Sequence, residues 1–299
     1  MAARLPADLT APDVLKDALL AMLRDAGDAP DPEAVRANAL EVIREAYDHG
    51  RGLIRAQFLE AGDSKKALRQ ATALIDRLIS VLFDFAGDHL FRIKGQHVTY
   101  HMAVVAVGGY GREELFPCSD VDVLFLHDGE EWNEVRQVAE FILYVLWDLG
   151  VQVGQTVSSI DELLQLTESD YTVCTNLLDA RFVCGNHEFL HRFREQFRAD
   201  VATESSVPAF VEAKLTERDA RHKRCGDSRY VLEPNVKEGK GGLRDIHMLY
   251  WLGRYVYRIR STRDLVKRGI LRPEEHRAYI RCLRFLSKIR IHLHLEAER

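Results

Sequence analysis

The chain has 299 residues, of which 46% are hydrophobic and 29% are charged. This is the balance of a globular protein with a sizeable core, and the length allows roughly two or three small domains. The formal net charge of −5 provides no basic field to attract a polyanion, which argues against nucleic acid as a partner. The densest apolar run, residues 141–147, is far too short to cross a bilayer, so no membrane partner is expected.

The N-terminus shows no signal-peptide pattern, because its first residues lead into an amphipathic, charged segment. The five cysteines are odd in number and none stands in a Cys-x-x-Cys pair. They are Cys118, Cys174, Cys184, Cys225 and Cys282. Free thiols in a reducing compartment are the simplest interpretation, so we expect a cytoplasmic protein without a cysteine metal site.

The first third of the sequence predicts helices. Apolar residues recur at helical spacing over residues 14–23, and again over about 33–60 and 64–85. We interpret residues 1–95 as an N-terminal helical region.

Residues 96–168 have a different pattern. The short β-branched runs 102–107 and 121–126 are typical of buried strands, and the first ends in Gly108-Gly109. Residues 132–149 have helical periodicity, and residues 150–157 alternate apolar and polar side chains. This order predicts an α+β fold, in which a small mixed sheet is flanked by helices.

After Asp161 the pattern is helical again, so residues 169–299 are expected to form a helical C-terminal region. A glycine-rich stretch interrupts the pattern at residues 232–242, and a helix resumes near Leu243. Residues 296–299 lie inside a periodic segment with no helix stop signal, so we expect a fragment of a longer protein.

Asp120 and Asp122 are the first candidates for chemistry. Residues two apart on a strand share a face, so the two carboxylates would lie together at the start of an apolar strand. Buried together without a cation they would repel each other, and one would take up a proton. Mg²⁺ resolves this repulsion, because it binds one or two carboxylates together with phosphate oxygens. A solvated Asp-x-Asp at the edge of a loop is the alternative for the motif alone.

Three glycines precede the acidic pair. Gly108, Gly109 and Gly111 follow a predicted strand and precede Arg112, which could open a helix. Backbone without Cβ atoms can approach a triphosphate closely, and its N–H groups can bind phosphate oxygens. A plain turn is the alternative for the glycines alone. Their combination with Asp-Val-Asp on the next strand is more specific for a nucleotide site.

The longer strings resemble known families. The glycine pair followed by Asp-x-Asp resembles the signature of the DNA polymerase beta-like nucleotidyltransferase superfamily. Residues 108–122 and 232–247 resemble motifs of the bacterial PII uridylyltransferase/uridylyl-removing family, a sensor of nitrogen status. The resemblance extends from about residue 35 to the end. It implies a polymerase beta-like core in a longer protein, with an HD domain that removes UMP and two ACT domains that sense glutamine.

The resemblance also implies a reaction. UTP would be attacked at its α-phosphorus by a tyrosine hydroxyl of the PII signalling protein, releasing pyrophosphate, with Mg²⁺ or Mn²⁺ as the cofactor. By motif match, the nucleotide-binding residues are Gly108, Gly109, Arg112 and Ser119, and the metal-binding residues are Asp120 and Asp122. For Ser119 a phosphate contact, orientation of the carboxylates and a turn or cap role all remain open.

The second motif carries basic residues. Lys237, Lys240 and Arg244 bracket a glycine-rich loop that leads into a predicted helix start, a suitable place for an anion. We expect this loop to close over the triphosphate or the acceptor, and a solvated surface loop is the alternative.

One expected ligand is missing. The superfamily usually adds a third carboxylate from a neighbouring strand, but residues 151–157 carry none. Glu233 and Asp245 are the candidates to replace it. The family's Gly-His-Ser-Val-Arg is replaced here by Gly-Gln-Thr-Val-Ser at residues 154–158. This departure leaves two alternatives: a related transferase for another nucleotide or acceptor, and a regulatory module that binds nucleotide without turnover.

Overall fold

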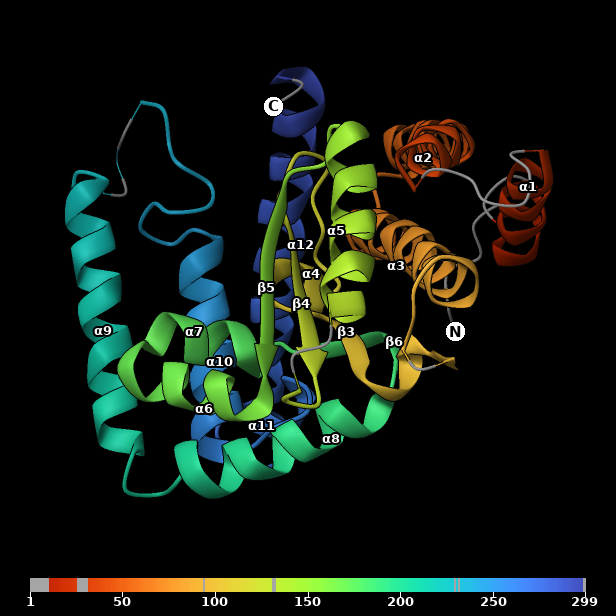
Figure 1. The fold of residues 1–299 in the computed structure, drawn as a ribbon. Coiled ribbons are helices and arrows are strands. Elements are labelled where there is room, and N and C mark those ends of the chain that lie inside the picture. Colours follow the sequence, from red (N-terminus) through yellow and green to blue (C-terminus); the bar gives the residue numbers. More distant parts are fainter. Residues whose placement is uncertain are drawn as a thin grey trace. The chain divides into compact units, whose positions relative to one another are not determined.

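The computed structural model describes residues 11–25, 32–93, 95–130, 133–228, 230 and 232–297 (Figure 1). The chain divides into two compact units, which are described separately. The first unit comprises Met1–Leu163 and Asp179–Phe193, and the second comprises Leu164–Leu178 and Arg194–Arg299. No helix in the described ranges is long and apolar enough to cross a lipid bilayer.

The first unit begins with the predicted helices. They are α1 (Pro12–Asp25), α2 (Pro32–Ala61) and α3 (Ser64–His89). The helix α3 starts where Asp63 caps it, since the Asp63 carboxylate accepts a hydrogen bond of 3.1 Å from the Lys66 N–H. The helical period of the sequence is therefore confirmed over this region.

A four-stranded sheet lies at the centre of the first unit (Figure 1). In spatial order its strands are β5 (Val153–Ser159), β4 (Val121–His127), β3 (Met102–Ala106) and β6 (Arg181–Gly185). Strand β3 runs antiparallel to β4 and β6, whereas β4 and β5 are parallel and joined through α5 (Asn133–Asp148). Parallel neighbours need such a crossover. This small mixed sheet with flanking helices confirms the predicted α+β fold class.

One face of the sheet is packed into the core. Val104 of β3, with Val121 and Val123 of β4, belongs to the same buried cluster as residues of α3 and α5. Because side chains alternate along a strand, Asp122 lies on the opposite face from Val121 and Val123. The acidic motif therefore avoids the apolar core of this unit.

Strand β6 was not predicted, because the sequence after Asp161 was interpreted as helical. Its sequence, Arg-Phe-Val-Cys-Gly, has three apolar residues in a row and no alternation of apolar and polar residues, and all five residues are half-buried. Antiparallel pairing with β3 makes it a strand. The short elements β1 (Arg92–Ile93), β2 (Gln96–His97) and the 3₁₀-helix η1 (Val98–Tyr100), which connect α3 to β3, were not predicted either.

The second unit is helical, as expected. It contains α7 (Tyr171–Leu178), the π-helix η2 (Phe197–Val201), α9 (Val207–Arg224), α10 (Leu243–Tyr257), α11 (Arg263–Lys267) and α12 (Pro273–Ala297). The helices α6 (Ile160–Ser169) and α8 (His187–Gln196) each begin in the first unit and end in the second. In the core of the second unit, the rings of Phe210 in α9 and Tyr255 in α10 stack with their centroids 3.8 Å apart, which joins the two helices.

Candidate functional site

The glycines form a short helix, α4 (Gly108–Gly111), directly after β3. Gly108 has φ of 57°, a region that favours glycine, and it turns the chain out of the strand. Arg112 ends this helix, because its N–H donates to the carbonyl of Gly108 at 3.1 Å. The expectation that Arg112 opens a helix is therefore wrong. The Glu114 N–H then donates to the carbonyl of Gly109 at 2.9 Å, a closure typical of helix C-termini.

The glycines of α4 serve different purposes. A Cβ at Gly111 would lie 2.3 Å from the carbonyl oxygen of Asp179 and 2.9 Å from that of Ala106, so the fold requires glycine there. A Cβ at Gly109 would have its nearest neighbour, the carbonyl oxygen of Glu114, at 3.6 Å, an ordinary contact. Packing does not demand glycine at 109, so the space left there is available to a ligand that approaches the turn.

Tyr110 anchors the glycine turn from within. Its side chain is fully buried, and its hydroxyl donates a hydrogen bond of 2.6 Å to Oδ1 of Asp76 in α3. Arg181 of β6 donates to Oδ2 of Asp76 at 2.9 Å, and its guanidinium lies 5.3 Å from the centre of the Tyr110 ring. Burial and the Asp76 carboxylate raise the pKa of Tyr110 well above its usual value. Sequence reasoning missed Asp76 and Arg181, since they stand 34 and 71 residues from Tyr110.

Arg112 is held by two carboxylates. Its guanidinium forms ion pairs with Asp179, whose side chain is fully buried, and with Glu114 at 3.0 Å. Although burial alone would lower the pKa of Arg112, Asp179 and Glu114 together raise it above its usual value. These pairs favour a structural role for Arg112, which fastens the end of the glycine turn to the segment before β6.

The structure joins the glycine turn to the acidic strand. The N–H of Val107, the residue before the turn, donates to the carbonyl of Asp122 at 3.0 Å. Asp122 is half-buried in β4, and Asp120 is exposed just before the strand. On the other side, the Val121 N–H donates to the carbonyl of Gln152 at 2.8 Å. Two motifs that were recognised separately in the sequence are therefore adjacent.

Ser119 closes a turn immediately before Asp120. Its hydroxyl accepts a hydrogen bond from the Phe116 N–H at 3.0 Å and donates to the Phe116 carbonyl at 3.2 Å. Among the roles that the sequence left open for Ser119, these contacts favour the turn. This turn leads the chain through Asp120 into β4.

The acidic pair offers carboxylate oxygens that could bind a metal ion. Mg²⁺ takes one or two carboxylates and completes its octahedron with water and phosphate oxygens, so Asp120 and Asp122 fit this ion. No carboxylate is present in β5, whose sequence is Val-Gly-Gln-Thr-Val-Ser-Ser. Within the described part of the chain, no group of three or more His, Cys, Asp or Glu side chains is arranged to hold a metal.

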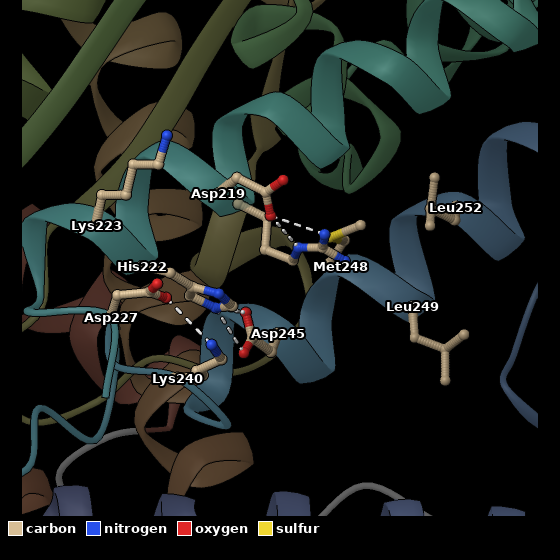
Figure 2. A pocket seen from close by; sticks show the side chains of 10 residues that line it. Asp219, His222, Lys223, Asp227, Lys240, Asp245, Met248, Leu249 and Leu252 are labelled. Atoms are coloured by element: carbon tan, nitrogen blue, oxygen red, sulfur yellow. Dashed lines mark hydrogen bonds and ion pairs between the residues drawn. The ribbon is translucent and has the colours of Figure 1, made fainter. Parts of the chain in front are cut away.

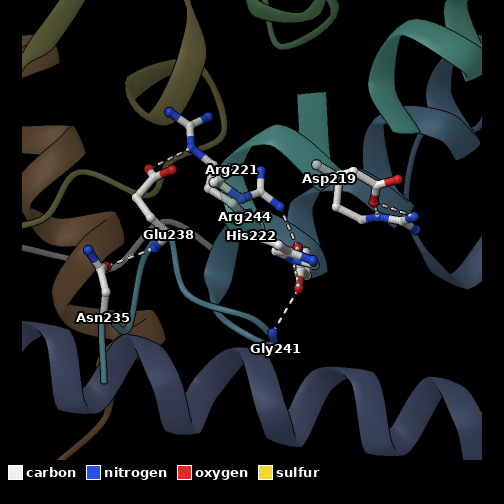
Figure 3. Close-up of polar contacts among 9 residues, drawn as sticks. Asp219, Arg221, His222, Asn235, Glu238, Gly241 and Arg244 are labelled. Carbon is white, nitrogen blue, oxygen red and sulfur yellow. Dashed lines mark hydrogen bonds and ion pairs between the residues drawn. The ribbon is translucent and has the colours of Figure 1, made fainter. Parts of the chain in front are cut away.

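The second sequence motif forms a compact loop before α10 (Figure 3). The side-chain oxygen of Asn235 accepts hydrogen bonds from the N–H groups of Lys237 at 3.0 Å and Glu238 at 2.8 Å. A Cβ at Gly239 would lie 2.6 Å from the carbonyl of Asn235, and one at Gly242 would lie 2.8 Å from two carbonyl oxygens. The loop is closely folded, and these glycines are required by its backbone.

Asp245, in the first turn of α10, fastens this loop to α9. Its carboxylate accepts the Gly241 N–H at 2.7 Å, lies 3.0 Å from Nε2 of His222, and pairs with the guanidinium of Arg221. Although burial alone would raise the pKa of Asp245, these three partners hold it below its usual value. The contacts favour an anchoring role over the metal-ligand role considered from the sequence, which did not identify His222 or Arg221.

The three predicted basic residues of the loop have different surroundings. Lys240 pairs with Asp227 at 3.1 Å. Arg244 pairs with Glu238 at 3.4 Å, and its guanidinium lies 5.7 Å from the centre of the Trp251 ring. Lys237 is exposed, as is Glu233 earlier in the loop. Lys240 and Arg244 thus form ion pairs with two separate carboxylates.

A cavity of about 720 Å³ lies in the second unit, lined by α9, α10 and the loop (Figure 2). It is lined by Arg218, Asp219, His222, Lys223, Asp227, Lys240, Asp245, Met248, Leu249 and Leu252. The apolar side chains come from α10 and the charged ones mainly from α9 and the loop. Lys240 and Asp245 are thus brought to one cavity.

Sequence comparisons identify relatives over most of the chain. The model of the family described as GlnD PII-uridylyltransferase matches residues 209–299. The bifunctional uridylyltransferase/uridylyl-removing enzyme of Erythrobacter litoralis is 43% identical over 266 residues, which are 88% of this chain and 28% of that protein. The enzyme of the same name from Rhodospirillum rubrum is 41% identical over 286 residues, 95% of this chain and 30% of that protein. The chain therefore spans less than a third of these relatives, and over that span its resemblance to the PII uridylyltransferase family is confirmed.

Proposed function

We propose that the chain transfers UMP from UTP to a tyrosine of a PII signalling protein, with Mg²⁺ as cofactor and pyrophosphate as the second product. The observation that supports this most directly is the hydrogen bond of 3.0 Å from the Val107 N–H to the carbonyl of Asp122. The bond joins the residue before the glycine turn to β4, which carries Asp122 and directly follows Asp120, and this arrangement suits a triphosphate and its metal. The names of the relatives and of the matching family support uridylyl as the group and PII as the acceptor.

In this proposal the three candidate site residues of the first unit, Gly109, Asp120 and Asp122, each have a defined role. Gly109 leaves space for the triphosphate, and the first N–H groups of α4, which have no intrahelical partner, would bind its oxygens. Asp120 and Asp122 would hold Mg²⁺, which when bound neutralises charge on the triphosphate and on the departing pyrophosphate. The tyrosine oxygen forms a bond to the α-phosphorus as the bond to the β-phosphate oxygen breaks, and the phenolic proton passes to solvent.

We also propose that the loop with Lys237, Lys240 and Arg244 binds an anionic part of the reactants. Lys240 and Arg244 are paired with carboxylates in ion pairs that remain accessible to solvent. Such pairs contribute little to stability, so both cations can exchange a carboxylate for a phosphate or an acidic acceptor at small cost.

The test is a transfer assay with each nucleotide in turn. The chain is incubated with PII, Mg²⁺ and one α-³²P-labelled nucleoside triphosphate, and the label on PII is located by mass spectrometry. We expect label from UTP alone, on one tyrosine, and none when EDTA is present. Label from another nucleotide would assign a related transferase. Metal-dependent UTP binding without pyrophosphate release would assign a nucleotide-binding module and overturn the proposal.

A further inference from the structure

We propose that Gly154 is a positioning residue for the carboxylate of Asp122, an inference that rests on the proposed function. In the parallel pairing of β4 with β5, Asp122 and Gly154 are register partners. A Cβ on Gly154 would lie 2.5 Å from Oδ1 of Asp122, closer than real Cβ atoms approach an oxygen. The Asp122 carboxylate therefore occupies the space that any side chain at residue 154 would need.

Neither the backbone nor the core explains this glycine. The φ angle of Gly154 does not lie in the left-handed region, so other residues could adopt its backbone conformation. The three atoms nearest to its Cβ position all belong to Asp122. Gly185, in the edge strand β6 of the same sheet, is different: its φ is 91°, and its Cβ would lie 2.6 Å from the carbonyl of Met102. The fold requires Gly185, whereas the only group that excludes a side chain at Gly154 is a predicted metal ligand.

A side chain at residue 154 would move the carboxylate and leave the strand in place. The backbone of Asp122 is held on its other side by the Val107 N–H, and β4 is paired with both β3 and β5. The side chain of Asp122 is the part that can rotate. Mg²⁺ demands near-octahedral geometry, with oxygen ligands at about 2.0–2.1 Å, so a rotated carboxylate would bind it poorly. Gly154 thus sets the position of one ligand without touching the metal.

The test is Gly154→Ala in the 299-residue chain. Two quantities are measured: Mn²⁺ affinity in the presence of UTP, by electron paramagnetic resonance, and the carboxyl ¹³C resonance of Asp122 without metal, assigned by its loss in Asp122→Asn. We expect affinity to fall by at least about tenfold and the resonance to move, with an unchanged melting temperature. Gly52→Ala is the matched control, because nothing lies within 4 Å of its Cβ position.

A double variant separates positioning from a general defect. In the Asp122→Asn background, Gly154→Ala should add less than about twofold to the loss of affinity, since the group that it displaces is no longer a carboxylate ligand. Gly154→Ala with wild-type Mn²⁺ affinity and an unmoved Asp122 resonance would overturn the inference. If the unmodified chain binds no Mn²⁺ with UTP, the proposed function fails instead, and the resonance still reports whether Gly154 positions Asp122.

Discussion

The hydroxyl of Tyr110 donates a hydrogen bond of 2.6 Å to the carboxylate of Asp76, which ties the glycine turn to α3. Arg181 of β6 binds the same carboxylate, at 2.9 Å and 3.0 Å. The turn proposed to bind the triphosphate is therefore held from the protein interior by two elements, α3 and β6. At Gly109 a Cβ would meet its nearest neighbour at 3.6 Å, so packing does not require glycine at this position of the turn.

Tyr110→Phe tests this anchor. Removing the hydroxyl leaves the half-buried carboxylate of Asp76 with one donor fewer, so we expect the free energy of unfolding in urea to fall by about 1–2 kcal/mol. Tyr100→Phe is the control, since the Tyr100 side chain is 67% exposed and its change should stay within about 0.5 kcal/mol. Equal stability of Tyr110→Phe and the unmodified chain would show that the hydrogen bond does not fasten the turn.

Asp120→Asn and Asp122→Asn test the proposed metal pair. If the pair holds the metal, each variant removes a charge that the metal needs, so turnover should fall by at least about a hundredfold while circular dichroism melts stay unchanged. Asp161→Asn, at an exposed position of α6, controls for the loss of one charge in the same unit. The pair is dispensable if both variants keep turnover within about threefold of the unmodified chain.

Gly109→Ala and Gly111→Ala should separate a ligand-facing glycine from a structural one. At Gly109 the new methyl group meets only ordinary contacts, so the protein should fold normally while KM for UTP rises through lost space. At Gly111 the methyl group would lie 2.3 Å from a backbone carbonyl, which should cost about 1–3 kcal/mol of stability. Thermal melts and UTP kinetics of both variants give the comparison. Unchanged UTP kinetics in Gly109→Ala would mean that the turn is only structural.

Alanine at Lys237, Lys240 and Arg244 together tests the loop. If these cations bind an anionic part of the reactants, kcat/KM should fall by at least about tenfold, which is about 1.4 kcal/mol of transition-state stabilisation. Alanine at the exposed Arg260, Lys267 and Arg268 removes the same charge from the same unit and should leave kcat/KM unchanged. Equal kinetics in the two triple variants would support a solvated surface loop.

Asp245→Ala tests the anchoring carboxylate and its pH dependence. Arg221, whose side chain is 5% exposed, would lose its ion-pair partner, so at neutral pH we expect a loss of about 3 kcal/mol in the free energy of unfolding. The pKa of Asp245 is lowered in the folded state. Its stabilising effect is therefore complete above the unfolded pKa of about 3.9 and disappears as pH falls through the folded value.

Urea unfolding of both proteins from about pH 7 down to about pH 3 measures this dependence. The difference between them should shrink only at the acid end of that range. Asp219→Ala, which removes an exposed partner of Arg218, serves as the control and should cost less than about 1 kcal/mol. A difference that stays constant across the range would contradict the assigned role of Asp245.

The sequence by itself determined the helices α1 to α3 and the strands β3 and β4, whereas the predicted shared face of Asp120 and Asp122 stays a prediction, because β4 begins at Val121. These features follow from local rules, because a helical period or a strand alternation is written in consecutive residues. The glycine turn was recognised for the same reason. The sequence did not predict the detailed shape of this turn. In the structure Gly108 begins a short helix with a positive φ, and Arg112 ends it.

Only the tertiary structure decided which distant residues meet at the site. The pairing of β6 with β3 brings Arg181 to Asp76 and Tyr110, and the register of β4 with β5 sets Gly154 against Asp122. The sequence alone left Asp245 as a candidate metal ligand. Packing of α9 beside α10 places His222 against its carboxylate, which favours an anchoring role. Strand register and helix packing join segments far apart in sequence, so no local pattern of residues encodes these contacts.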